Sequence, residues 1–288
     1  MFSPADHAVL RRAYARYVTF LSGADNTALE QAFAAVPRES YLGAGPWAVL
    51  AWGGDYRETP DSDPAWLYHD CLVAIVRERR LNNGQPSGHA KWISAVAPQR
   101  GEHVVHIGAG VGYYSAILAH MVGPQGRVTA IEYDPELASR AAANLAEVAQ
   151  VQVLQGDGAC IPFAPADVIY VNAGATHPPD AWLDGLTEGG RLILPLTTAT
   201  NFGATFSAAR PTGATFRFTR RGDGFDADFV SYAAFIPCEG LRDEASERAL
   251  AAAFEKGGFH DVKRLRRDEN VADEDCWMKT ARFSLTYR

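Results

Sequence analysis

The chain has 288 residues, enough to bury a large hydrophobic core in a single α/β domain or in one domain with additions. A formal net charge of −7 and an isoelectric point near 5.6 exclude the basic field that a main function in nucleic-acid binding would need. No apolar run suits a membrane span, the N-terminus lacks a signal-peptide pattern, and four scattered cysteines indicate reduced thiols, so we expect a cytoplasmic protein without membrane partners.

The first hundred residues are predicted to be mostly helical. Apolar residues at helical spacing predict a helix over residues 4–21. A second helix is expected over residues 26–35, and it should end there because the residue before Pro37 avoids the helical region. Residues 43–64 are rich in glycine, proline, tryptophan and aspartate and predict an irregular loop. The apolar residues 71–76 then predict a short strand, and residues 88–96 predict a helix.

From residue 101 onward, strands and helices are predicted to alternate. The expected strands are 103–107, 127–132, 151–154, 167–172 and 190–196. The expected helices are 113–121, 135–148 and 178–186. Alternation of this kind predicts parallel pairing with helices on both faces of the sheet, which is an α/β fold.

Beyond residue 197 the pattern changes to antiparallel pairing. Aromatic and polar side chains alternate over residues 203–237, with glycines between them, and predict strands joined by turns at the C-terminal edge of the sheet. A helix is expected over residues 244–256, ending at two glycines. The last thirty residues are predicted to form one or two strands, with residues 276–287 as the best candidate.

A glycine-rich turn follows the first predicted strand of the alternating region. Gly108, Gly110 and Gly112 stand between that strand and a helix, where a ligand can approach the backbone without meeting a Cβ atom. The dinucleotide fingerprint Gly-x-Gly-x-x-Gly would need a glycine at position 113, which is Tyr113. The spacing instead resembles the first motif of methyltransferases that use S-adenosylmethionine (SAM).

Two acidic residues follow the next two predicted strands. Glu132 ends the second strand, where a carboxylate can accept hydrogen bonds from ribose hydroxyls, and Asp157 stands between Gly156 and Gly158, where it can accept from the adenine amine. The plainer alternatives are a surface glutamate at a strand end and a turn aspartate. Because three matches fall at successive carboxyl ends of parallel strands, an adenosine site is favoured.

These motifs together resemble the protein-L-isoaspartate O-methyltransferases over most of residues 28–197. The matching stretches are residues 32–39 (AFAAVPRE), 85–90 (QPSGHA), 104–113 (VVHIGAGVGY), 130–132 (AIE), 156–158 (GDG) and 189–195 (GGRLILP). The resemblance implies a Rossmann-like methyltransferase fold with strand order 3-2-1-4-5, SAM at the carboxyl ends of the strands, and methyl transfer to a carboxylate. A carboxylate is ionised at neutral pH, so alignment and a dry site matter more than a base.

The resemblance also implies which residues form the site, with no metal among its ligands. Those facing the acceptor would be Asn83, Gly84, Gln85, His89 and Asn172. Those binding the cofactor would be His106, Gly108, Gly110, Gly112, Tyr113, Glu132, Asp157, Gly158 and Asn172. We also expect Thr176 and His177 near the acceptor; helix capping by this polar loop is the plainer alternative.

Three features depart from the family pattern. The family usually has a serine or threonine at the position of Gly84, and Asn83 or Gln85 could replace that hydroxyl. An acidic residue usually precedes the glycine turn where His106 stands, and a neutral imidazole can accept one hydrogen bond but adds no charge. The chain also continues beyond Pro237 with no matching motif. A backbone-bonded strand histidine and a packed helix histidine are the plainer interpretations of His106 and His89.

The sequence therefore predicts a SAM-dependent methyltransferase that acts on a carboxylate of a peptide or small molecule other than the usual repair substrate. The alternatives are true isoaspartyl repair and a catalytically silent binding module with the same SAM-binding fold. The expected divisions are 1–100, a helical region with the substrate loop; 101–200, the SAM-binding core; 201–240, antiparallel strands; and 241–288, a helix-strand extension. The sequence sets neither the acceptor nor the oligomeric state.

Overall fold

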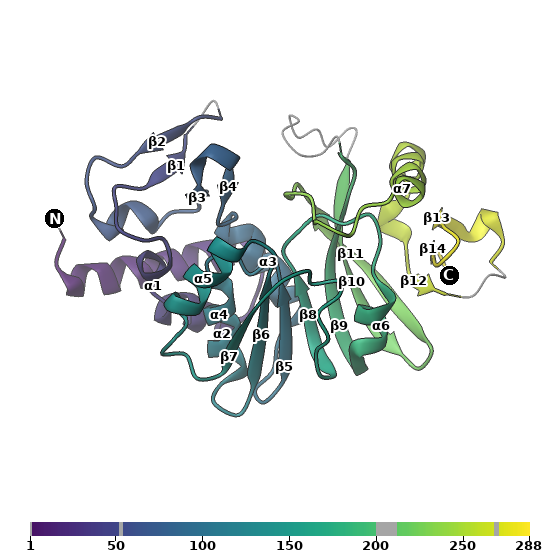
Figure 1. Ribbon diagram of the computed structural model, residues 1–288, viewed down its shortest axis with the longest axis horizontal. Helices are drawn as coiled ribbons and strands as arrows, with labels where there is room; N and C mark the ends of the chain where they lie inside the picture. Colours follow the sequence, from purple (N-terminus) through teal and green to yellow (C-terminus); the bar gives the residue numbers. More distant parts are fainter. Residues whose placement is uncertain (1, 52–53, 200–211, 268–270) are drawn as a thin grey trace. The chain divides into compact units, whose positions relative to one another are not determined.

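The computed structural model describes residues 2–51, 54–199, 212–267 and 271–288. The chain forms two compact units, each built from two stretches of sequence. Residues Met1–Glu102 and Ala109–Gln155 form the first, and residues His103–Gly108 and Gly156–Arg288 form the second. Figure 1 follows the chain from its N-terminus in purple to its C-terminus in yellow.

The first unit combines α-helices with short hairpins and a parallel pair of strands. Its helices are α1 (Pro4–Ser22), α2 (Thr27–Ala35), α3 (Pro86–Val96), α4 (Tyr113–Val122) and α5 (Pro135–Asn144). Its strands are β1 (Ala48–Leu50), β2 (Tyr56–Glu58), β3 (Ala74–Val76), β4 (Leu81–Asn82), β6 (Arg127–Glu132) and β7 (Val151–Gln155). The pairs β1–β2 and β3–β4 are antiparallel, whereas β6 and β7 run parallel.

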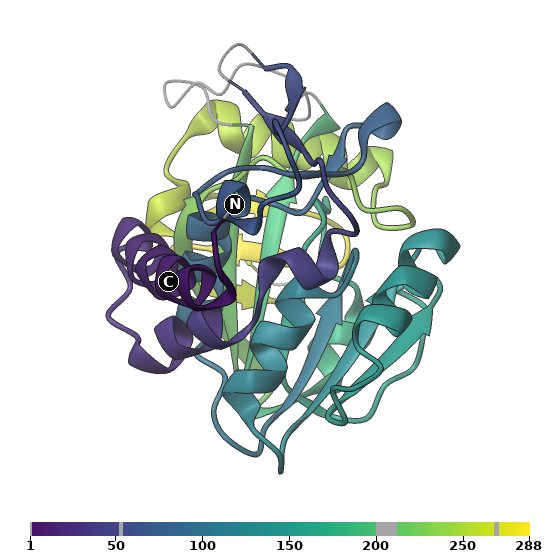
Figure 2. The same ribbon diagram turned by 90° about the vertical axis from the view of Figure 1, so that its left-hand side faces the viewer.

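Helix boundaries in this unit follow the capping signals of the sequence. Ser3 and Asp6 form a capping box at the start of α1, and Gly23 ends the helix in the left-handed conformation. Asp134 accepts hydrogen bonds from two backbone N–H groups of α5, which packs against β6 and β7 (Figure 2). The predicted helix over 135–148 is too long, because residues after Asn144 form hydrogen-bonded turns that lead into β7.

The predicted irregular loop over 43–64 contains the β1–β2 hairpin, so that prediction is wrong in part. Each strand has only three residues, too few to show an alternating pattern. The hairpin is joined to a small core of Leu42, Trp47, Leu67 and Val73, against which Val49 of β1 packs. A 3-10 helix over Pro64–Leu67 follows the hairpin.

The second unit carries a sheet with a parallel part and an antiparallel part (Figure 1). Its strands are β5 (His103–Ile107), β8 (Ala166–Val171), β9 (Leu186–Thr197), β10 (Gly213–Arg221), β11 (Gly224–Tyr232), β12 (Arg264–Arg266), β13 (Cys276–Lys279) and β14 (Ser284–Thr286). Their order is β13-β14-β12-β11-β10-β9-β8-β5. The pairs β5–β8 and β8–β9 are parallel, and the remaining pairs are antiparallel.

The α/β fold with antiparallel strands toward the C-terminus is confirmed. The expected strand order is found within each unit, as β7–β6 in the first and β5–β8–β9 in the second. Part of the predicted antiparallel region, residues 200–211, lies outside the described residues, but β10 and β11 form the expected hairpin. Phe216 of β10 and Phe225 of β11 are fully buried.

The C-terminal residues are integral to the second unit. Helix α7 (Glu244–Lys256) has the predicted bounds, and a short helix, α6 (Asp180–Gly185), follows β8. The sequence predicted one or two strands in the last thirty residues but did not locate β12. This strand pairs with β11 and β14 and so joins the last strands to the sheet. Trp277 of β13 packs against Phe254 of α7 and Phe216 of β10. None of the helices described in either unit is long and apolar enough to cross a membrane.

Candidate cofactor and acceptor site

The glycine turn has the backbone conformation that its glycines predict. Gly108, Gly110 and Gly112 have φ values of +74°, +57° and +93°, all in the left-handed region that favours glycine. A Cβ atom on Gly112 would lie 2.6 Å from Leu145 Cδ1, whereas one on Gly110 would meet only Ile75 Cδ1 at 3.7 Å. Gly112 is therefore needed for packing, and Gly110 leaves an open approach to the backbone.

Glu132 is bound directly to this turn. Its Oε2 accepts a hydrogen bond from the Gly110 N–H at 2.7 Å, and its Oε1 accepts one from the Asp134 N–H at 3.0 Å. Burial raises the pKa of the carboxyl above its usual value, and the backbone donors at Asp134 and Gly110 oppose that rise. A carboxylate has further lone pairs, so Glu132 can accept hydrogen bonds from a ligand as well.

Tyr113, predicted to bind the cofactor, is buried in the first unit. Its hydroxyl lies 3.5 Å from that of Tyr14, and its ring packs against Phe33 and Tyr41. Desolvation raises the pKa of the Tyr113 phenol well above its usual value, so it is neutral across the physiological range. A packing role is evident, and a cofactor contact stays a prediction.

The acceptor loop predicted at residues 83–85 is held by a buried arginine. Asn83 Oδ1 accepts hydrogen bonds from Arg38 Nη2 at 3.1 Å and from the Val73 N–H at 3.1 Å. The same guanidinium donates to the carbonyl oxygens of Leu67 and Cys71 at 2.8 and 2.7 Å. Arg38 is completely buried, and its hydrogen bond fixes the position of the Asn83 side chain.

The remaining acceptor-loop residues are fixed by other contacts. Gln85 Nε2 donates to Asp70 Oδ2 at 2.8 Å, and Asp70 also accepts from the backbone and side chain of Ser87. The imidazole of His89 is buried and stacks on the ring of Tyr114, with centroids 3.5 Å apart and an interplanar angle of 4°. The first unit thus brings Asn83, Gly84, Gln85 and His89 into one ordered loop and helix start.

In the second unit, Asn172 lies against the start of the glycine turn. Its backbone N–H donates to the Ile107 carbonyl at 2.8 Å, and its Nδ2 reaches the Gly108 carbonyl at 3.5 Å. A Cβ atom on Gly108 would lie 3.2 Å from the Asn172 carbonyl oxygen. The structure therefore brings these two predicted residues together.

Asp157 shapes the turn after β7 with its own backbone and side chain. Its Oδ1 accepts from the Ala159 N–H at 2.8 Å, and its Oδ2 lies 3.5 Å from Cys160 Sγ. Gly158 is required beside it, because a Cβ atom there would lie 2.7 Å from Ile107. The turn role of Asp157 is evident, and its contact with adenine stays a prediction.

His106 is completely buried in β5 and packs against the ring of Tyr170, with centroids 5.2 Å apart. Burial lowers the pKa of its imidazole to about 3. The ring is therefore neutral at physiological pH and adds no charge to its surroundings, and its contact with the cofactor stays a prediction.

The sequence did not predict the roles of two side chains, those of Arg38 and Asp243. Arg38 was visible only as part of the stretch 32–39, and nothing in the spacing linked it to Asn83. Asp243, in the C-terminal extension, lies 3.2 Å from His177 Nδ1, and Thr176 Oγ1 lies 3.1 Å from the same nitrogen. Only the folded chain brings these distant stretches together.

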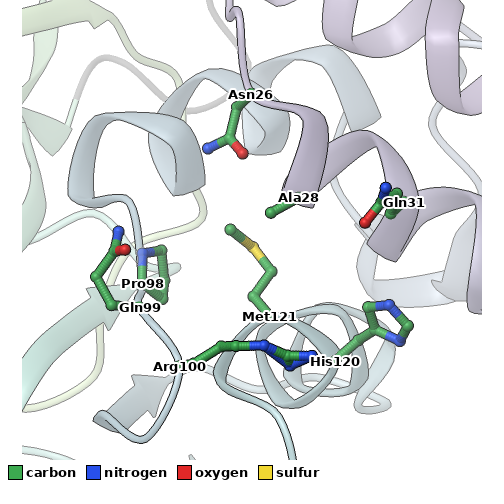
Figure 3. A pocket seen from close by; sticks show the side chains of 8 residues that line it. All are labelled: Asn26, Ala28, Gln31, Pro98, Gln99, Arg100, His120 and Met121. Atoms are coloured by element: carbon green, nitrogen blue, oxygen red, sulfur yellow. The ribbon is translucent and has the colours of Figure 1, made fainter.

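A separate pocket of about 390 Å³ lies in the first unit beside the N-terminus of α2 and the end of α4 (Figure 3). It is lined by Asn26, Ala28, Gln31, Pro98, Gln99, Arg100, His120 and Met121. None of the predicted site residues lines it, and its polar side chains are partly or fully exposed. The pocket is not the predicted cofactor site.

A glycine turn after one parallel strand, bound to an acidic residue that ends another, defines the Rossmann-like class of cofactor-binding α/β proteins. The family model for protein-L-isoaspartate(D-aspartate) O-methyltransferase matches residues 60–215. This match covers more than half of the chain, and the chain belongs to that family. The resemblance drawn from the sequence motifs is confirmed.

Curated relatives carry the family name. The protein-L-isoaspartate O-methyltransferase of Methanopyrus kandleri is 36% identical over 144 residues, which are 44% of this chain and 64% of the relative. Protein-L-isoaspartate O-methyltransferase 1 of Rhodopseudomonas palustris is 40% identical over 165 residues, 56% of this chain and 58% of the relative. The chain thus spans less than two thirds of the length of these two relatives.

Two solved structures share the fold. A protein-L-isoaspartate O-methyltransferase has a TM-score of 0.66 at 24% identity, covering 83% of this chain and 69% of the other. A putative enzyme of the same name from Plasmodium falciparum, in complex with S-adenosyl-L-homocysteine, has a TM-score of 0.60 at 15% identity, covering 80% and 98%. The Rossmann-like methyltransferase fold is therefore confirmed.

Proposed function

We propose that the chain is a SAM-dependent O-methyltransferase that transfers a methyl group to a carboxylate of a peptide or small molecule. Family membership supports the reaction class, and the hydrogen bond between the Gly110 N–H and Glu132 is the observation that carries the cofactor assignment. That bond places a carboxylate at an open glycine turn, where ribose hydroxyls would find an acceptor. When bound, SAM supplies an electrophilic methyl group on a sulfonium.

The chain's own residues would bind and align the reactants. Glu132 would hold the ribose, and Gly110 would let the cofactor approach the backbone closely. The acceptor carboxylate would need no base from the chain, since its oxygen is already ionised at neutral pH. The other residues predicted to bind the cofactor keep that role in this proposal. They are Gly112 and Tyr113 in the first unit, and His106, Gly108, Asp157, Gly158 and Asn172 in the second.

Calorimetry with SAM and S-adenosylhomocysteine tests the cofactor assignment. Gly110→Ala should weaken binding about tenfold or more, because the added methyl group would occupy space that the bound cofactor needs. The protein itself should tolerate the methyl group, which makes only an ordinary contact with Ile75. Glu132→Gln should weaken binding about tenfold through the lost charge-assisted hydrogen bonds. Gly101→Ala is the matched control, because Gly101 has φ +86° with no atom within 4 Å of an added Cβ. Undetectable binding by the unmodified protein would favour a silent module and reject an enzyme.

Two acceptors compete within this proposal. The names of the relatives favour an isoaspartyl residue, as in repair methylation. The acceptor loop favours a different carboxylate, because Gly84 offers no hydroxyl and the His89 imidazole takes the space beside it. For this reason we propose a carboxylate other than that of an isoaspartyl residue as the preferred acceptor.

A labelled-methyl assay decides between them. An isoaspartyl peptide and its normal aspartyl twin would be compared at equal concentrations with the unmodified protein. We expect slow, unselective labelling of both. Fast labelling of the isoaspartyl peptide alone would establish repair activity, and Asn83→Ala and Gln85→Ala would then show which side chain takes over from the missing hydroxyl.

A further inference from the structure

The segment after β11 lies alongside the loop that follows β8. We call residues 236–243 the strap. The Gly174 N–H donates to the Ile236 carbonyl at 2.8 Å, and the Cys238 N–H donates back to the Gly174 carbonyl at 2.9 Å. The Thr176 N–H donates to the Leu241 carbonyl at 3.1 Å. The strap therefore pairs with the loop through its backbone, as an added strand would.

The end of β9 holds the same loop from the opposite side. The Ala175 N–H donates to the Pro195 carbonyl at 3.0 Å, and the Thr197 N–H donates to the Ala175 carbonyl at 2.9 Å. With hydrogen bonds on both sides, residues 174–176 have the support of an inner strand although they follow β8 as a loop. Removing the strap would leave one side of this loop without partners.

Arg242 joins the strap, the loop and the end of β9 through one side chain. Its Nη1 donates to the Gly174 carbonyl at 3.0 Å, and its Nη2 donates to the Thr197 carbonyl at 2.9 Å. Nη2 also lies 2.6 Å from Glu247 Oε2 on α7. The side chain is only 18% exposed. A planar guanidinium can serve several acceptors in fixed directions, and a lysine ammonium cannot reproduce this pattern.

Two further strap residues contact residues predicted for the site. Gly240 has φ +77°, and a Cβ atom there would lie 2.6 Å from Asp157 Oδ2. Asp243 Oδ2 lies 3.2 Å from His177 Nδ1, while the same carboxylate caps α7 through Ser246. The strap thus touches the turn predicted to bind adenine and the loop predicted to face the acceptor.

We propose that the strap is a part of the methyltransferase site, in which Arg242 is a positioning residue for the loop at 172–177 and Gly240 leaves room for the Asp157 carboxylate. This inference rests on the proposed function. It assigns a role to the first residues of the C-terminal extension, for which the sequence offers no motif.

Arg242 is tested with Arg242→Lys and Arg242→Ala against Arg248→Ala, a control on α7 whose arginine pairs with Glu244 on the exposed surface. We expect both Arg242 variants to raise the KM for the isoaspartyl test peptide about tenfold while the SAM dissociation constant changes less than about twofold. Amide hydrogen exchange at residues 174–176 should become faster in the Arg242 variants alone. Kinetics and exchange that match those of Arg248→Ala would overturn the positioning role.

Gly240 is tested with Gly240→Ala against Gly257→Ala, whose glycine has a similar φ of +73° but no atom within 4 Å of an added Cβ. The positive φ is thereby matched, and only Gly240→Ala places a methyl group against Asp157. We expect SAM affinity to fall about fivefold or more in Gly240→Ala alone. Equal affinity in the two variants would overturn the spacer role. If the unmodified protein binds no SAM, the proposed function fails, and exchange at 174–176 still decides whether Arg242 holds the loop.

Discussion

At the scale of single residues, Gly84 and His89 form a linked pair. Gly84 has φ +75°, and a Cβ atom on it would lie 2.1 Å from His89 Nε2. His89 cannot withdraw freely, since its ring is buried and stacked on Tyr114. The glycine that departs from the family pattern is therefore required by the packing of a histidine that matches the pattern.

Restoring the family's hydroxyl at this position should damage the protein. We expect Gly84→Ser to lower the free energy of unfolding by about 2–4 kcal/mol, through backbone strain and overpacking. Adding His89→Ala should recover part of that loss, so the two changes are non-additive in urea denaturation. Gly54→Ser is the control for backbone strain, because Gly54 has φ +90° and no atom of the described residues lies within 4 Å of an added Cβ. A Gly84→Ser loss no larger than the Gly54→Ser loss would contradict the linkage.

At the scale of elements, the N-terminus of α1 is tied to the 3-10 helix at Pro64–Leu67 through Asp63. The Asp63 carboxylate accepts from the Ala65 N–H at 3.0 Å, from the Phe2 N–H at 2.7 Å, and lies 2.8 Å from His7 Nε2. The hydrogen bond from Ala65, assisted by His7 and Phe2, lowers the pKa of Asp63 to about 2. One ionised side chain thus fixes two elements.

This tie should weaken in acid. An aspartate in the unfolded chain has a pKa of about 3.9. The stability that Asp63 contributes is therefore complete above that pH and is lost as the pH falls toward about 2. We expect Asp63→Asn to lower Tm at pH 6 and to show a smaller further drop between pH 5 and pH 2.5 than the unmodified protein, measured by circular dichroism. Asp25→Asn, in the exposed turn between α1 and α2, is the charge control. Parallel pH profiles for the unmodified protein and Asp63→Asn would argue against the tie.

Elements with strong local signals could be predicted from the sequence, and elements without them could not. The bounds of α7 were predicted because Leu250 and Phe254 have helical spacing and two glycines follow. Strand β12 could not be located from the sequence because it has three residues, of which only Leu265 is buried, between two exposed arginines. Its existence depends on pairing with β11 and β14, which no local pattern encodes.

At the scale of the whole molecule, the sequence predicted the fold class and the left-handed glycine turn, because the spacings of the glycines and acidic residues are local signals. It did not predict the supports of the site. Arg38 reaches Asn83 across 45 positions, and Arg242 reaches Gly174 across 68. Such contacts follow from tertiary packing, so they became visible only with the folded chain.

Local stability should differ among the strands in a way that amide hydrogen exchange can map. We expect the slowest amide hydrogen exchange in β8, which is buried and paired on both sides by β5 and β9, and fast exchange in the three-residue strands β1 and β2. Mass spectrometry of peptic fragments after timed labelling gives this comparison. Protection of β1 and β2 equal to that of β8 would contradict it.

The contact between Cys160 and Asp157 has a practical chemical consequence. Cys160 is exposed, and its hydrogen bond to Asp157 raises the pKa of the thiol, so little thiolate forms at neutral pH. Iodoacetamide should therefore alkylate this cysteine slowly, and faster in Asp157→Asn. Any compound that engages the Asp157 carboxylate would change that rate, which makes Cys160 a built-in chemical reporter for screening ligands before an acceptor is known.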